Sequence, residues 1–128
     1  MRHQVLTPAF RREDERGLFV EGLNDGRWES LLFGSMRRGA VLGNHYHKKT
    51  EIFFCLITGR AEVAIVQVDT NERERLTLGP EQGVRLAVKE SHAIHFLEAS
   101  EFIMLKSLRY DPADPDTFPH PVDGAAVP

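Results

Sequence analysis

The chain has 128 residues, of which 41% are apolar and 27% charged, and its formal net charge is −3. This length suits one domain with its own core, and the composition is that of a globular rather than a disordered chain. The sequence has no basic stripe with interleaved aromatic residues, no run of roughly 18 apolar residues that could span a bilayer and no apolar N-terminal signal segment, and its single Cys55 has no intramolecular disulfide partner. We therefore expect a cytoplasmic protein without a nucleic-acid or membrane partner.

Short apolar runs separated by glycine, asparagine, aspartate and proline fill the chain, and no segment keeps the i, i+3, i+4 spacing of a long amphipathic helix. The expected strands, in chain order, are residues 17–21, 28–35, 43–47, 51–57, 61–68, 73–78, 84–88, 92–97 and 102–110. Many short strands at this spacing indicate an all-β sandwich or barrel. We expect one domain over residues 1–128, with the barrel at about 16–110 and an irregular, proline-rich tail at 111–128 that lies across it.

The strand expected at residues 51–57 is apolar on both of its faces. An exposed sheet face normally carries polar residues in alternation, so a second layer must cover this one. The opposing sheet, the N-terminal segment or a second copy of the chain could supply that cover. Cys55 lies within this strand and is expected to be a buried apolar residue rather than a nucleophile.

The strongest motif runs from Gly39 to Gly59 and has the pattern G-x5-H-x-H-x3-E-x7-G. Residues two apart in a strand share a face, so His45 and His47 point the same way, about 7 Å apart along the backbone. If the alternation continues through the short turn that follows, Glu51 shares that face.

A second histidine-bearing strand is expected at residues 92–97. His92 is in phase with Ile94 and therefore points into an apolar interior, whereas His95 faces the opposite side. His3 and His120 are expected, like His95, to be structural or surface residues.

His45, His47, Glu51 and His92 together predict a metal site. Three imidazoles and one carboxylate suit a divalent transition metal such as Zn, Ni, Fe or Mn, and ligand type alone does not choose among these ions. The alternative is that the histidines are hydrogen-bonded core side chains and that no metal binds.

The segment from Gly39 to Gly59 is similar to cupin motif 1, whose two histidines and glutamate bind a metal in many members. His92 corresponds to the histidine of cupin motif 2, although residues 88–92 lack the proline and glycine that usually precede it. The chain thus resembles the cupin superfamily. The resemblance implies a single double-stranded β-helix, or jelly-roll, barrel.

Residues 13–21 resemble the D-x-R-G-x-F-x-E stretch of the RmlC-like deoxysugar-nucleotide 3,5-epimerases. That resemblance implies that Arg16, Phe19 and Glu21 help to bind a nucleotide, often across a dimer interface. Residues 43–48 resemble the nucleotide-sugar 3,4-ketoisomerases and the C-terminal cupin of a capsular-polysaccharide UDP-sugar enzyme. Similar cupins are dimers, so a homodimer is expected here.

The chemistry that these families imply is proton transfer beside a 4-keto group. His45 or His47 would be the base, and a bound metal could polarise the ketone. Tyr110, at the end of the last expected strand, is a weaker candidate for the acid. Leu42 and Leu105 stand where the 3,5-epimerases have an arginine and a tyrosine, which argues against straight 3,5-epimerisation.

The sequence therefore favours an isomerase or epimerase that acts on a nucleotide-linked keto-deoxysugar. Two alternatives are a metal-dependent cupin oxygenase and a non-catalytic cupin that binds a small molecule. The stretch from Arg16 to Glu21 favours the sugar enzyme, because an oxygenase has no need of it.

Overall fold

The computed structural model describes residues 2–122, which form eleven strands and no helix. The strands are β1 (Phe10–Asp14), β2 (Gly17–Glu21), β3 (Ser30–Met36), β4 (Val41–Tyr46), β5 (Ile52–Thr58), β6 (Ala61–Gln67), β7 (Arg73–Leu78), β8 (Gly83–Leu86), β9 (Glu90–Phe96), β10 (Ser100–Lys106) and β11 (Phe118–Pro119). Among these residues there is accordingly no helix of the length and apolarity needed to cross a membrane.

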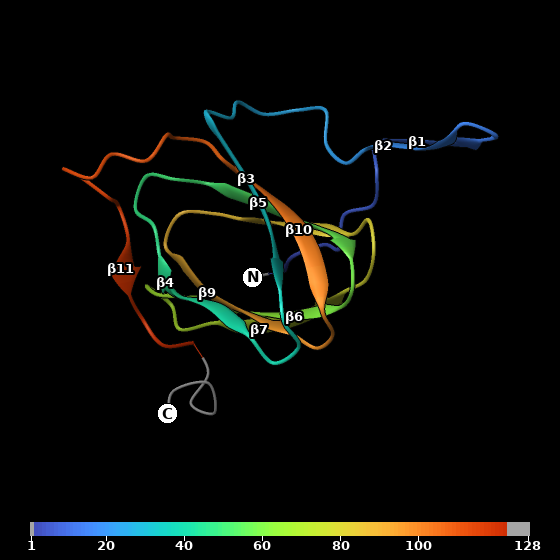
Figure 1. Ribbon diagram of the computed structural model, residues 1–128. Coiled ribbons are helices and arrows are strands. Elements are labelled where there is room, and N and C mark those ends of the chain that lie inside the picture. Colours follow the sequence, from blue (N-terminus) through green and yellow to red (C-terminus); the bar gives the residue numbers. More distant parts are fainter. Residues whose placement is uncertain (1, 123–128) are drawn as a thin grey trace.

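Two antiparallel sheets form the opposite walls of a barrel (Figure 1). The four-stranded sheet has the order β3-β10-β5-β8, and the five-stranded sheet has the order β11-β4-β9-β6-β7. Their inner faces meet in one apolar cluster that includes Phe54 of β5, Ile65 of β6, Ile94 of β9 and Phe102 of β10. The all-β barrel predicted from the sequence is confirmed.

The inward row of β5 differs from the prediction by one residue. The core takes Ile52, Phe54 and Leu56, so the row that contains Glu51 and Phe53 points outward. The turn between His47 and β5 changes the phase of the alternation, which a one-residue shift is enough to reverse.

The outer face of the four-stranded sheet is only partly covered. The N-terminal segment reaches it, since Leu6 and Gly83 form a β-bridge, and Phe53 is only 3% exposed. Farther along the same sheet, the edge strand β3 leaves Leu31 63% exposed and Phe33 77% exposed. One expected cover is thus present over β5 and β8, while β3 keeps two large apolar side chains in solvent.

Both ends of the chain contain strands that the sequence did not predict. β1 pairs with β2 in a hairpin that projects from the barrel (Figure 1). In the tail, which was expected to be irregular, β11 pairs with β4 through the contacts of Phe118 with Tyr46 and of Pro119 with His45. Residues 123–128 of the predicted tail lie outside the described residues.

Candidate functional site

Three histidines converge on the inner face of the five-stranded sheet. His45 on β4 pairs with His92 on β9, and His47 follows just after β4. One ring nitrogen from each histidine lies within 4.8 Å of the other two. The ring centroids are 5.1 Å apart for His45 and His47, and 4.9 Å apart for His45 and His92.

A local backbone irregularity sets the position of His45 along β4 relative to His92 on β9. Gly43 and Asn44 have φ values of 107° and 59°, and the pairing of β4 with β9 shifts register between Gly43 and His45. A Cβ atom at Gly43 would lie 2.3 Å from the carbonyl oxygen of His92. Only glycine allows this close approach, which is typical of a β-bulge beside a functional site.

Burial keeps the three imidazoles neutral near pH 7. Desolvation, followed by the charge of His47 and that of Lys106, lowers the pKa of His45 to about 4. Desolvation, followed by the charge of His45, lowers the pKa of His92 to about 3, and desolvation also lowers the pKa of His47. Neutral imidazole is both a proton acceptor and the form that binds metals.

The C-terminal tail fixes the ring of His47. Its Nδ1 donates to the backbone carbonyl of Asp116 at 2.6 Å, which leaves Nε2 as the acceptor nitrogen. That Nε2 atom is buried and has no hydrogen-bond partner in the part of the chain that the structure describes. The arrangement leaves a bare lone pair for a proton or a metal ion.

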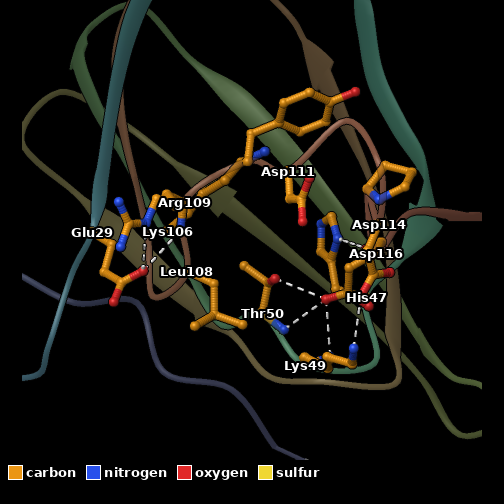
Figure 2. Close-up of a pocket in the computed structure, with 12 residues that line it drawn as sticks. Glu29, His47, Lys49, Thr50, Lys106, Leu108, Arg109, Asp111, Asp114 and Asp116 are labelled. Carbon is orange, nitrogen blue, oxygen red and sulfur yellow. Dashed lines mark hydrogen bonds and ion pairs between the residues drawn. The ribbon is translucent and has the colours of Figure 1, made fainter.

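The Asp116 carboxylate holds the turn that follows His47. It accepts hydrogen bonds from the backbone N–H groups of Lys49 and Thr50 and from the Thr50 hydroxyl (Figure 2), and from the backbone N–H of Lys48, at 2.8 to 3.0 Å. Burial acts to raise the pKa of this carboxyl, but these hydrogen bonds outweigh it, and the pKa lies below its usual value. The charged carboxylate thereby connects the tail to the histidine cluster.

A pocket of about 230 Å³ opens beside His47 at one end of the barrel. Both signs of charge are present in its lining, which consists of Glu29, His47, Lys49, Thr50, Lys106, Leu108, Arg109, Tyr110, Asp111, Asp114, Pro115 and Asp116 (Figure 2). A small polar ligand in this pocket would lie against the imidazole of His47.

The model of one protein family, the polysaccharide biosynthesis C-terminal domain, matches residues 12–118. The chain belongs to this family. No curated protein matches it. As a family member with a barrel of this topology, the chain has the fold of the RmlC-like cupins that the sequence predicted.

Solved structures share this cupin fold at low sequence identity. The ChmJ 3'-monoepimerase of Streptomyces bikiniensis is 18% identical over 96% of this chain and 70% of its own, with a TM-score of 0.78. The dTDP-4-dehydrorhamnose 3,5-epimerase of Sulfolobus tokodaii is 17% identical over 88% and 80%, with a TM-score of 0.74. The capsular polysaccharide assembling protein CapF of Staphylococcus aureus is 22% identical over 88%, with a TM-score of 0.69, and this cupin spans only 34% of that chain.

The structure brings together three of the four residues predicted to bind a metal. Glu51 lies apart from His45, His47 and His92, and its carboxylate is 3.4 Å from Nε of Arg85. The phase change before β5 explains this position, because it turns Glu51 toward the outside of the barrel. The remaining donor set is three neutral imidazoles with an open side, which suits a divalent transition metal.

Tyr110 lines the pocket with His47 but lies outside the last core strand. β10 ends at Lys106, four residues earlier than Tyr110, and the Tyr110 side chain is 65% exposed. Leu42, at the position of the epimerase arginine, packs against the apolar core instead.

The predicted nucleotide-binding residues lie on the projecting hairpin, away from the histidines (Figure 1). Arg16 forms an ion pair with Asp14 at 2.7 Å, and Phe19 is 58% exposed beneath the guanidinium of Arg12. Glu21 is also exposed. Within one chain, therefore, these side chains and the histidine cluster do not form a single site.

Two site residues were missed by the sequence reasoning. Asp116 lies in the segment expected to be irregular, and nothing local to its position signals its bonds to residues 47–50. Lys106 carried a signal that could have been used, because it is two residues beyond Met104 and four beyond Phe102, both of which contact the core.

Proposed function

We propose that this cupin is an isomerase or epimerase that moves a proton beside the keto group of a nucleotide-linked deoxysugar. The observation that carries the proposal is the bare Nε2 atom of His47, held in one tautomer by Asp116 at the wall of a polar pocket. Several structures with this fold are named as epimerases of such sugars, which supports the same substrate class here.

In this mechanism His47 accepts the proton from the carbon next to the ketone. Removal of that proton is assisted if the base is neutral and already oriented, and burial and Asp116 provide these two conditions. His45, whose ring centroid is 5.1 Å from that of His47, is the second candidate for the base. The Tyr110 hydroxyl would return a proton from the pocket side.

A divalent metal would be held by His45, His47 and His92, and would polarise the ketone oxygen when bound. One lone pair of His47 cannot hold a metal and accept a proton at the same time. The metal content of the active protein therefore decides whether His47 is the base or a ligand.

We propose that the active form is a homodimer in which the hairpin of one copy binds the nucleotide of the other. The exposed Leu31 and Phe33 on β3 are an apolar face that a second copy would cover. Arg16 and Phe19 offer a cation for a phosphate and an aromatic ring for a base, with Glu21 beside them. Such a dimer would be a cytoplasmic enzyme whose recognition residues and base come from different chains.

The test is proton exchange on a defined sugar. The purified protein is incubated in D₂O with dTDP-4-keto-6-deoxyglucose, and separately with its UDP counterpart, while deuterium at the carbons beside the ketone is followed by NMR. We expect protein-dependent exchange with one of them and a rise in melting temperature with the corresponding nucleoside diphosphate. Absence of both exchange and thermal shift with either nucleotide would rule the proposal out.

A further inference from the structure

Lys106 is a charged residue on the inward row of β10. Phe102 and Met104 on this strand contact the apolar core, and residues two apart share a face, so Lys106 also faces the barrel interior. Its side chain lines the same pocket as His47 and Thr50 (Figure 2). A lysine in such a row costs free energy unless its charge has a partner.

The acidic side chains of the pocket already have other partners. Asp116 accepts the hydrogen bonds of residues 48–50, Asp114 pairs with Lys49 at 2.8 Å, and Glu29 accepts the backbone N–H of Arg109. Within residues 2–122 the ammonium group of Lys106 has no hydrogen bond or ion pair of its own.

The charge of Lys106 is close enough to affect the whole cluster. It contributes to the lowered pKa of His45, of His47 and of His92. A cation without a counterion that faces neutral imidazoles leaves a place for a negatively charged oxygen between them.

On the basis of the proposed function, we propose that Lys106 is a further catalytic residue whose ammonium binds the keto oxygen of the sugar and the enolate oxygen that forms from it. When the base takes the proton from the neighbouring carbon, the C–H electron pair becomes the C=C bond. The π electrons of the C=O bond then move to the oxygen, which receives a hydrogen bond from Lys106. A proton delivered to that carbon by the Tyr110 hydroxyl restores the ketone, and solvent carries the proton held by the base back to the tyrosinate, so no other reactant is needed. The ammonium thereby stabilises charge that exists only during the reaction.

The main test replaces Lys106 by methionine, which fits an apolar inward row, and by arginine, which keeps the charge. Lys48→Met is the matched control, because the Lys48 ammonium lies over the ring of Phe118 and does not line the pocket. Exchange of deuterium into dTDP-4-keto-6-deoxyglucose, or into its UDP counterpart if that is the substrate, should lose about 100-fold or more in kcat for Lys106→Met. KM should change much less, and Lys48→Met should behave as wild type.

A second measurement needs no turnover and so remains informative if the sugar reaction itself fails. Acetate and its neutral isostere acetamide are titrated into the protein while histidine side-chain resonances are followed by NMR. Acetate should bind to wild type about tenfold or more tightly than to Lys106→Met, while Lys106→Arg keeps most of the affinity and acetamide does not distinguish the variants. A melting temperature at or above that of wild type for Lys106→Met would support the proposal, because replacing a lysine that only stabilises the fold would lower the melting temperature. Equal acetate affinity in wild type and Lys106→Met, or no acetate binding to wild type, would overturn it.

Discussion

The barrel interior and the N-terminal hairpin contain the two halves of the predicted site, and they differ in how complete they are. The histidine cluster is assembled, buried and hydrogen-bonded within one chain. The hairpin of β1 and β2 projects from the barrel away from β4 and β9 (Figure 1), and its Arg16 and Phe19 side chains are exposed. The groups that could do chemistry are thus positioned by the fold of a single chain, whereas the groups proposed to recognise the nucleotide need a second chain to reach it.

Loss of the bare nitrogen in the barrel should have the largest effect. His47→Gln is expected to lower the rate of deuterium exchange by about 10³-fold, because a positioned acid or base contributes at this level. His95→Gln is the control, since His95 lies on the opposite face of β9 from the cluster. Undiminished exchange in His47→Gln would show that the base lies elsewhere.

Removal of the Asp116 carboxylate, which holds the turn after His47, should mainly affect the free energy of unfolding. Asp116→Ala leaves three backbone N–H groups and the Thr50 hydroxyl without their acceptor, so urea denaturation should report a loss of about 3 kcal/mol in unfolding free energy. Asp114→Ala removes only an exposed ion pair with Lys49 and should cost less than about 0.5 kcal/mol. Equal losses for the two variants would contradict the anchoring role.

Metal binding can separate Glu51 from the histidines. Zn²⁺ affinity, measured by competition with a coloured chelator, should fall about 100-fold or more in His92→Ala, because a direct ligand matters at least as much as an outer-shell partner. Glu51→Gln should change it less than about threefold, since the Glu51 carboxylate pairs with Arg85 outside the cluster. A similar loss of Zn²⁺ affinity in both variants would show that Glu51 is a metal ligand after all.

A substitution in the apolar face on β3 can show whether nucleotide binding depends on the dimer while the histidine cluster does not. Phe33→Asp should make the protein monomeric by light scattering, at a cost of about 2 kcal/mol or more in association. It should also remove the thermal shift with dTDP or UDP while Zn²⁺ affinity stays unchanged. A monomeric wild type at micromolar concentration would exclude the dimer, and a monomeric variant that keeps the nucleotide shift would exclude binding across it.

Acid should weaken the barrel rather than the hairpin. The pKa values of His45 and His92, about 4 and about 3, lie below the usual 6.5. Between these lowered values and pH 6.5, the unfolded chain therefore binds more protons than the folded protein does. Unfolding free energy and melting temperature should therefore fall as the pH drops from 6.5 toward 4, and His92→Leu should make this fall shallower. His3, whose pKa is raised chiefly by its hydrogen bond to Glu90, has the opposite effect only above pH 6.5. A melting temperature that is constant from pH 6.5 to 4 would contradict the neutral cluster.

The predictions that succeeded depended on alternation within one strand. His92 points inward because Ile94 in the same strand points inward, and this relation is local. The step from His47 to Glu51 crosses a turn, where one residue reverses the face and no local pattern reports the change. β1 was missed because its sequence, Phe10 to Asp14, is mostly charged and has no apolar alternation.

The contacts of the tail could not be predicted for a different reason. Asp116 is 66 to 69 residues away from the groups that it binds, and its partners are mostly backbone N–H groups, which have no sequence signature. Lys106 was not predicted because the last strand was expected to continue to Tyr110, so the candidate residue was placed at the end of that longer strand. A check of which charged residues share a face with core residues would have identified it.

The bulge at Gly43 and Asn44 has a consequence for protein engineering. A side chain at Gly43 would collide with the backbone of β9, and the side-chain oxygen of Asn44 accepts the backbone N–H of Val122 from the tail. Libraries intended to change the ligand should therefore leave these two positions constant. Diversity is better placed at Leu108 and Arg109, whose exposed side chains line the pocket outside the strands and have no part in the proposed proton transfer.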